Sequence, residues 1–254
     1  EEFPNFWQNV YLYFASAETV KSDFEKNFPQ DLSMNYQHVE FFGYPALKPY
    51  YKLEKNSSGA TCIMWSPRWS FDGKIAGSHF MEYKDDFIAL SKKFGDKVKL
   101  IFRPHPDLFN ELMRKKFMSR EKIMAYDETL KANKIHRQTT LAGMFDSIRP
   151  VDIFITDYSS IMCPLFLTGR PIIYCEFPNA IPLPEYEEMF AAMYTAHSWE
   201  DVERYVDDLM AGNDPLFEKR QEIAKRLYEL HKDSAQKIVD RIIQDFKDNE
   251  LDDD

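Results

Sequence analysis

The feature that most constrains the fold is an alternation of short, largely apolar segments with longer amphipathic ones. Apolar runs at residues 60–65, 97–102, 151–155 and 172–174 are each followed by a segment with helical character. Strands that are apolar on both faces need cover on both faces, which is typical of parallel sheets joined by crossover helices. We therefore predict an α/β protein with a doubly wound parallel sheet and extra helices at the C-terminal end.

The balance of charged residues limits the ligands that the chain can attract. The sequence has 32 Lys and Arg against 42 Asp and Glu, which gives a formal net charge of −10 at pH 7. An acidic protein does not attract nucleic acid through a general electrostatic field, so we expect no nucleic-acid partner. Any anionic ligand must therefore be held by a local group of cations and hydrogen-bond donors.

The sequence gives no sign of a metal site or of a membrane-spanning segment. Cys62, Cys163 and Cys175 lie in or beside apolar runs, so we expect buried thiols rather than disulfides or zinc ligands. No carboxylate cluster stands out, so we predict no metal site and no cofactor in the protein. Whether a metal ion assists the function stays open. No apolar run reaches the roughly 18 residues that a spanning helix needs.

The run Arg103-Pro104-His105-Pro106 closes the strand predicted at 97–102. Each proline favours extended backbone in the residue before it, and residues two apart in an extended chain point the same way. The spacing therefore predicts that Arg103 and His105 point to one spot beyond the sheet edge, with Asp107 capping the next helix. The alternative is a proline-rich strand exit whose Arg and His pair with nearby carboxylates.

The run Thr156-Asp157-Tyr158-Ser159-Ser160 follows the strand predicted at 151–155. Ser159 and Ser160 stand where the next helix is expected to begin, so they are predicted to cap it and to form an anion site with its free N–H groups. Asp157 would repel phosphate, and we expect it to orient His105 or another base, to accept from a ligand hydroxyl, or to cap the turn. The alternative is two ordinary capping serines. Pro164 predicts an irregular or later helix start.

A third polar segment closes the strand predicted at 60–65. Ser66 and Arg68 follow that strand, and Arg68 adds a cation at the same sheet edge. His79 lies in the loop that comes next. The alternatives are a surface or aromatic-stacked arginine and a plain loop histidine.

These segments, taken in order, resemble one known family. The resemblance rests on residues 13–16, 42–45, 65–67, 103–106, 156–160 and 168–172, within a stretch from about residue 10 to 210. Together they resemble the CDP-glycerol glycerophosphotransferase family of teichoic-acid and capsule polymerases. The resemblance implies the GT-B fold and a reaction in which an acceptor hydroxyl displaces CMP from a CDP-linked polyol.

The same resemblance implies roles for the strand-end residues. His105 would be the catalytic residue, which contacts the pyrophosphate or assists proton transfer. Donor phosphate and nucleotide contacts would come from Arg68, Arg103, Asp157, Ser159 and Ser160, with Ser66, His79, Thr156 and Tyr158 as further candidates. Such phosphoryl transfer depends on positioning and charge neutralisation more than on covalent chemistry.

The resemblance also implies a domain division, partners and a location. Residues 1–50 would be linker strands or the end of an N-terminal GT-B domain, and residues 51–250 the C-terminal nucleotide-binding Rossmann-like domain. The expected partners are a CDP-linked polyol, a polymer acceptor and the N-terminal domain, without which the chain is expected to be inactive. We expect a cytoplasmic location with peripheral contact at the inner face of the membrane.

Two other functions stay open at this point. One is a GT-B glycosyltransferase domain that uses a nucleotide-sugar donor. The other is a noncatalytic domain that binds a nucleotide or a phosphorylated polymer.

Overall fold

The computed structural model describes residues 7, 9–54, 59–72, 76–138, 144–178 and 187–250. The chain forms two compact units, each with its own hydrophobic core. The larger unit is Tyr50–Ala224, and the smaller unit combines Glu1–Pro49 with Lys225–Asp254. The division into domains of a longer GT-B architecture stays a prediction.

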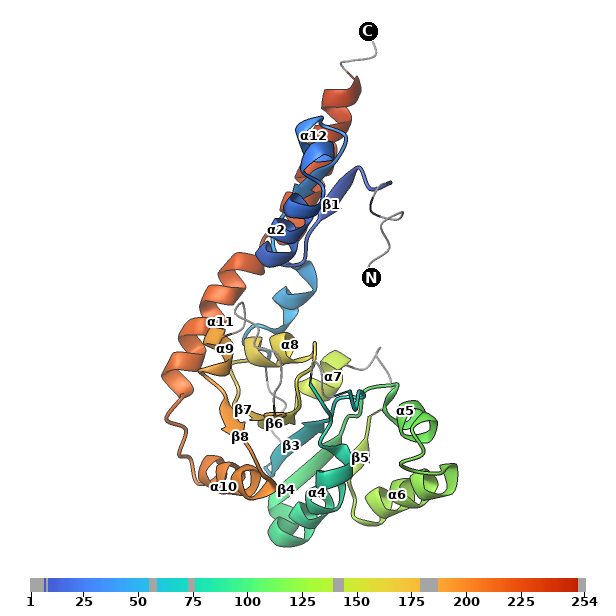
Figure 1. Cartoon of the computed structure of the whole chain (residues 1–254). Helices are drawn as coiled ribbons and strands as arrows, with labels where there is room; N and C mark the ends of the chain where they lie inside the picture. Colours follow the sequence, from blue (N-terminus) through green and yellow to red (C-terminus); the bar gives the residue numbers. More distant parts are fainter. Residues whose placement is uncertain are drawn as a thin grey trace. The chain divides into compact units, whose positions relative to one another are not determined.

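The larger unit is built on a parallel sheet of six strands (Figure 1). The strands are β3 (Thr61–Ser66), β4 (Val98–Phe102), β5 (His136–Arg137), β6 (Ile153–Thr156), β7 (Ile172–Cys175) and β8 (Tyr194–Ala196). Their order across the sheet is β5-β4-β3-β6-β7-β8, and every neighbouring pair is parallel. This confirms the predicted doubly wound α/β fold. The short strands β5 and β8 were not predicted.

Helices lie between these strands along the chain. They are α4 (Phe80–Phe94), α5 (Leu108–Arg114), α6 (Arg120–Ala132), α7 (Met144–Ile148), α8 (Met162–Leu167) and α9 (Glu187–Phe190), with the 3₁₀ segment η2 (Gly95–Lys97). The 3₁₀ segment η1 (Pro45–Tyr50) precedes β3, and α10 (Trp199–Met210) follows β8. Helix α11 (Phe217–His231) begins in the larger unit and ends in the smaller one.

The sheet is buried on both faces. Alternate strand residues such as Trp65 and Phe102 join one large cluster with α4, α5, α6 and α10. The intervening residues, such as Met64 and Phe154, are also fully buried. The ring of Trp65 lies 5.9 Å from that of Phe80 and 5.5 Å from that of Phe102. Continuous apolar runs in the strands therefore reflect cover on both faces, as predicted.

The smaller unit has a two-stranded parallel sheet, β1 (Leu12–Phe14) with β2 (His38–Glu40). Its helices are α2 (Glu18–Asn27), α3 (Pro29–Ser33) and α12 (Ser234–Glu250). Ala15, Phe24 and Val39 form its core. Ser16 has a residue type that favours N-caps, but Ala17 occupies the N-cap position of α2 and makes no side-chain cap hydrogen bond.

None of the three cysteines, all in the described part of the chain, forms a disulfide. Cys62 and Cys175 are buried, as expected, whereas Cys163 is only half-buried. No helix in the described part of the chain is both long and apolar enough to cross a membrane.

Candidate functional site

The strand order brings the three sequence motifs to one edge of the sheet. β3 lies between β4 and β6, and all three run in the same direction. The chain passes from β3 outward to β4 and β5, then returns to place β6 on the other side of β3. This reversal is the switch point at which open α/β sheets bind ligands, outside the carboxyl ends of their strands. The three motifs follow β3, β4 and β6 directly.

Asp157, the first residue after β6, joins two other loops to this turn. Its side chain is fully buried, and Oδ2 accepts from the backbone N–H of Arg68 at 2.8 Å. Oδ2 also lies 3.4 Å from the backbone nitrogen of His79 and 3.5 Å from the hydroxyl of Ser78. Oδ1 lies 2.8 Å from Nδ1 of His79, whose ring is itself only 4% exposed. We call these four residues the Asp157 cluster.

The contacts of Asp157 favour one of the roles expected for it, that of holding neighbouring groups in place. Both carboxylate oxygens already contact protein groups, and the imidazole beside them is that of His79, not of His105. Because the ring of His79 also stacks on that of Tyr83 at 4.9 Å, the expectation of a plain loop histidine is wrong. The cluster fixes the loops after β3 and β6 relative to each other, which is a positioning role.

Within the Asp157 cluster, Arg68 is the residue that carries a fixed positive charge. Its backbone is held by Asp157, and Nη1 donates to the carbonyl oxygen of Tyr158 at 2.8 Å. The guanidinium lies over the Tyr158 ring, 5.4 Å from its centroid, so the alternative of an aromatic-stacked arginine holds as well. Arg68 Nε and the hydroxyl of Ser66 are buried without a hydrogen-bond partner in the described part of the chain. Orphaned polar atoms are uncommon in protein interiors and favour a polar ligand at this edge.

His105 lies against the residue that follows this arginine, Trp69. Its ring is 5.9 Å from that of Trp69, and its side chain is half-buried. Burial lowers the pKa of His105 below its usual value of 6.5, while Asp107 opposes and Arg68 reinforces that shift. Nδ1 accepts from the backbone N–H of Asp107 at 3.2 Å. Because a backbone amide can only donate, the proton of the neutral ring must be on Nε2.

Arg103 does not point to the same spot as His105, contrary to the prediction from their spacing. The Arg103 side chain is 7% exposed, and Nη1 donates to the hydroxyl of Ser147 on α7 at 3.2 Å. Burial lowers the pKa of this guanidinium, and the nearby Tyr50 partly opposes that effect. The prolines hold the backbone extended, but they leave the long side chain of Arg103 free to pack against α7.

The serine pair does not cap α8, contrary to prediction. The helix begins at Met162, and Ile161 occupies the N-cap position without a side-chain cap hydrogen bond. The later start agrees with the expectation for Pro164. Ser159 is half-buried and Ser160 exposed, directly after Tyr158 at the site edge. Asp107 likewise occupies the N-cap position of α5 without capping it through its side chain.

Thr156 has a structural position. Its side chain is fully buried, and its hydroxyl donates to the carbonyl oxygen of Ser66 at 3.0 Å, which joins the ends of β6 and β3.

The predicted site residues form two sets, which differ in their exposure. The outer set of exposed or half-buried residues is Arg68, His105, Tyr158, Ser159 and Ser160, and the buried set is Ser66, His79, Arg103, Thr156 and Asp157.

Trp69 lies beside the predicted site residues but is not among them. Its indole is 37% exposed and lies against the ring of His105. The available signal was its place one residue after Arg68 at a strand exit.

Among the described residues, no group of three or more His, Cys, Asp or Glu side chains is placed to hold a metal ion.

The family model described as CDP-Glycerol:Poly(glycerophosphate) glycerophosphotransferase matches residues 5–244. The chain belongs to this family. Membership agrees with the resemblance drawn from the motifs, which identified the same family of transferases. No curated protein matches the sequence.

Solved structures show the same fold. The wall teichoic acid polymerase TagF, in crystals soaked with CDPG, matches with a TM-score of 0.58 and 17% identity over 98% of this chain and 62% of that chain. A UDP-N-acetylglucosamine 2-epimerase matches with a TM-score of 0.55 and 11% identity over 90% and 57%. MnaA of S. aureus with UDP matches with a TM-score of 0.55 and 13% identity over 91% and 60%. The family member described here thus shares the GT-B fold and spans about three fifths of these chains.

Proposed function

We propose that this chain binds the donor of a glycerophosphotransferase. In the proposed reaction, glycerol phosphate or ribitol phosphate passes from a CDP-activated donor to a growing surface polymer. The observation that carries the proposal is that Arg68 contacts Tyr158, and His105 contacts Trp69 next to Arg68, at the switch point of a chain that belongs to this family. Action in the cytoplasm, with peripheral contact at the membrane, is part of the same proposal.

The reaction balances without a covalent enzyme intermediate. An oxygen of the acceptor hydroxyl attacks the phosphorus that carries the polyol, and the bond from that phosphorus to the bridging oxygen breaks. CMP leaves with the electron pair, and the hydroxyl proton passes to a base or to solvent. The protein must hold the two phosphates in line and neutralise the charge that develops on them.

Arg68 supplies fixed positive charge for this task. Its backbone and guanidinium are both held before any ligand arrives, by Asp157 and by the Tyr158 carbonyl. A cation that is already oriented loses little further freedom when it binds phosphate, and this favours stabilisation of a developing charge. Ser159 and Ser160 follow Tyr158 and are placed to add hydroxyl contacts.

The tautomer of His105 favours one of its two expected roles. The backbone N–H of Asp107 occupies Nδ1, which leaves Nε2–H as a donor. A neutral N–H donor at that place suits a hydrogen bond to a phosphate oxygen of the donor. It does not suit removal of the proton from the acceptor hydroxyl. We therefore propose that His105 contacts the donor phosphates.

Calorimetry with CDP-glycerol, CDP-ribitol and UDP-N-acetylglucosamine tests the donor class. We expect the two CDP-polyols to bind and the UDP-sugar to bind at least tenfold more weakly. Arg68→Ala should weaken CDP-glycerol binding by about tenfold, because a charge-assisted hydrogen bond contributes about 1.5 kcal/mol. Arg204→Ala is a matched control, because Arg204 is an exposed arginine on α10.

Turnover with a polymer acceptor, measured on this chain joined to the expected N-terminal GT-B domain, separates the enzyme from a noncatalytic binding domain. His105→Ala should lower the rate of CMP release by two to four orders of magnitude, as is typical for loss of a catalytic acid or oriented donor (roughly 10²–10⁴-fold). His105→Asn keeps an N–H donor and should retain more activity. Equal turnover by the wild type and His105→Ala would contradict the proposed role and favour a noncatalytic domain.

A further inference from the structure

Positive charge is concentrated in one stretch of this acidic chain. Residues 113–137, here called the basic segment, contain eight Lys and Arg against three Asp and Glu. The rest of the chain has 24 against 39. The basic segment runs from the end of α5 through α6 to β5, and seven of its eight Lys and Arg are exposed. A local basic surface on an acidic protein indicates a dedicated anionic partner.

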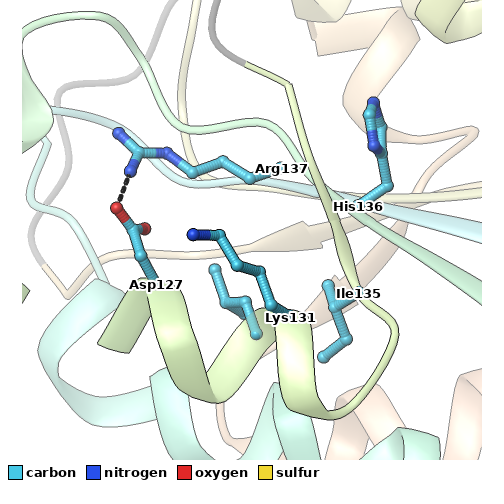
Figure 2. Close-up of a pocket in the computed structure, with 6 residues that line it drawn as sticks. Asp127, Lys131, Ile135, His136 and Arg137 are labelled. Carbon is cyan, nitrogen blue, oxygen red and sulfur yellow. Dashed lines mark hydrogen bonds and ion pairs between the residues drawn. The ribbon is translucent and has the colours of Figure 1, made fainter. Parts of the chain in front are cut away.

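The basic segment contains a cavity of about 340 Å³ between α6 and β5 (Figure 2). Its lining residues are Asp127, Leu130, Lys131, Ile135, His136 and Arg137. Figure 2 shows the side chains of Lys131 and Arg137 extending toward Asp127. Three of the six lining side chains are basic, and one is a carboxylate. This combination suits a ligand that has both phosphate and hydroxyl groups.

The existing ion pairs leave the cavity open to an anion. Lys131 pairs with Glu128 at 2.7 Å, but both side chains are at least 70% exposed, and such exposed pairs contribute little. Arg137 pairs with Asp127, and its guanidinium lies 4.4 Å from the Phe109 ring centroid. Lys131 can thus turn to an incoming phosphate at small cost, while Arg137 is held in place.

The cavity lies next to the candidate site. β5 pairs with β4 so that Arg137 lies opposite Phe102, and the amide N–H of Gln138 donates to the Phe102 carbonyl at 2.9 Å. His105 follows Phe102 by three residues at the same carboxyl edge of the sheet. A ligand in the cavity would therefore lie at β5, the direct neighbour of β4, and His105 lies in the loop that follows β4.

A second contact joins the basic segment to the site. The ring of Phe117, between α5 and α6, meets the ring of Phe71 edge-on at 5.2 Å. Phe71 belongs to the loop that carries Arg68 and Trp69, and Trp69 in turn contacts His105. The basic segment thus packs against the loop that carries the proposed donor cation.

We propose that the basic segment binds the polyanionic acceptor, a polyol-phosphate polymer, and that Lys131, His136 and Arg137 hold one of its phosphates. This inference rests on the proposed function, since the acceptor is a polymer of phosphodiesters only if the transfer is correct. The rival occupant is an anionic membrane, which the exposed Met113 and Met124 in the same segment suit. A flat bilayer cannot enter a cavity beside the strand edge, whereas a flexible chain of phosphates can.

The test compares two charge-reversal pairs. Lys131→Glu with Lys134→Glu reverses two cations of the basic segment. Lys92→Glu with Lys97→Glu is the matched control, because these lysines are also exposed but lie in α4 and η2, outside that segment. Circular dichroism checks that both variants are folded. The probe is a soluble synthetic glycerol-phosphate oligomer, with its Kd measured at two salt concentrations.

We expect the Lys131/Lys134 pair to weaken oligomer binding by about tenfold or more and to reduce its salt dependence. The control pair should change binding by less than about twofold. CDP-glycerol binding should be unchanged in both variants, because none of these lysines lies at the Arg68 edge. Equal oligomer affinity in the wild type and the Lys131/Lys134 variant would overturn the inference.

Two further arms distinguish a polymer from a membrane, and the acceptor site from the donor site. If the variant loses binding to phosphatidylglycerol-containing vesicles but keeps oligomer binding, the segment binds membrane and the inference fails. If the oligomer binds through Lys131 and Lys134 but CDP-glycerol does not bind at all, the polymer site stands and the proposed donor function fails. The two proposals can therefore fail separately.

Discussion

Replacing Asp157 tests whether one buried carboxylate holds the candidate site together. In Asp157→Ala, the backbone N–H of Arg68 and the Nδ1 atom of His79 both lose partners at 2.8 Å. A buried donor without a partner costs about 1–3 kcal/mol, and this change leaves two such donors, the Arg68 N–H and the His79 Nδ1–H. We therefore expect Asp157→Ala to lower the free energy of unfolding by about 3–5 kcal/mol.

Asp157→Asn should cost less, for a reason that depends on orientation. The amide oxygen can face the two backbone N–H groups, while the amide nitrogen can donate to His79 if that ring changes tautomer. Most hydrogen bonds then survive, and only their charge-assisted strength is lost, which gives about 1–2 kcal/mol. Asp96→Asn is the control, because Asp96 is an exposed carboxylate in η2, and it should change stability by less than about 0.5 kcal/mol.

Urea denaturation followed by tryptophan fluorescence measures these differences. Three of the four tryptophans, Trp65, Trp69 and Trp199, belong to the larger unit, so the signal reports mainly on the unit that contains Asp157. The expected order of cost is Ala, then Asn, then the control. A loss below about 1 kcal/mol for Asp157→Ala would refute the argument that this carboxylate fixes the loops.

Three more changes test other parts of the structure. His231 accepts a backbone N–H at 2.9 Å, and burial lowers its pKa from 6.5, so its stabilisation is complete above about pH 6.5 and is lost as the pH falls through the folded-state pKa. In thermal melts, His231→Gln should therefore cost about 1 kcal/mol at pH 7.5 and less at pH 5, and an equal cost at both would contradict this. Trp65→Ala removes a fully buried indole and should cost about 3–5 kcal/mol in urea titrations, whereas a loss under about 2 kcal/mol would argue against its central packing. Gly169→Ala and Gly212→Ala both place Ala at positive φ, which costs about 1–2 kcal/mol. Gly169→Ala should cost about 1 kcal/mol more, because its Cβ would lie 2.7 Å from the Gln221 amide, and equal costs in the same titration would exclude that contact.

The sheet could be predicted because its strands carry their own signal. Runs such as 97–102 and 151–155 are largely apolar, with Lys97, Lys99 and Asp152 as exceptions, and strands covered on both faces favour such a composition. β5 consists of His136 and Arg137, which have no apolar pattern, and it exists through pairing with β4. Strands of this kind depend on a partner that is distant in sequence, and local pattern cannot reveal them.

The sequence allowed the position of the site to be predicted, but not the directions in which its side chains point. Topology alone places the ends of neighbouring parallel strands together, so the motifs were correctly expected at one edge. Side-chain directions depend on partners such as Ser147, which lies 44 residues from Arg103. The contact between Asp157 and His79 spans 78 residues, and no spacing rule predicts it.

Capping failed for a related reason. Ser16 and Ser160 have the right residue type for an N-cap, but each helix begins after them, at Glu18 and at Met162. Residue preference states what a helix end favours, while the chain around it decides where that end falls.

Two of the contacts of Asp157 are to main-chain amides, those of Arg68 and His79. Every amino acid except proline carries such an amide, so these two anchors of the loop after β3 do not depend on which side chain stands at position 68. The proposed donor preference could therefore be redesigned by exchanging that side chain while both anchors remain. Proline is the one replacement that would remove the anchor together with the arginine.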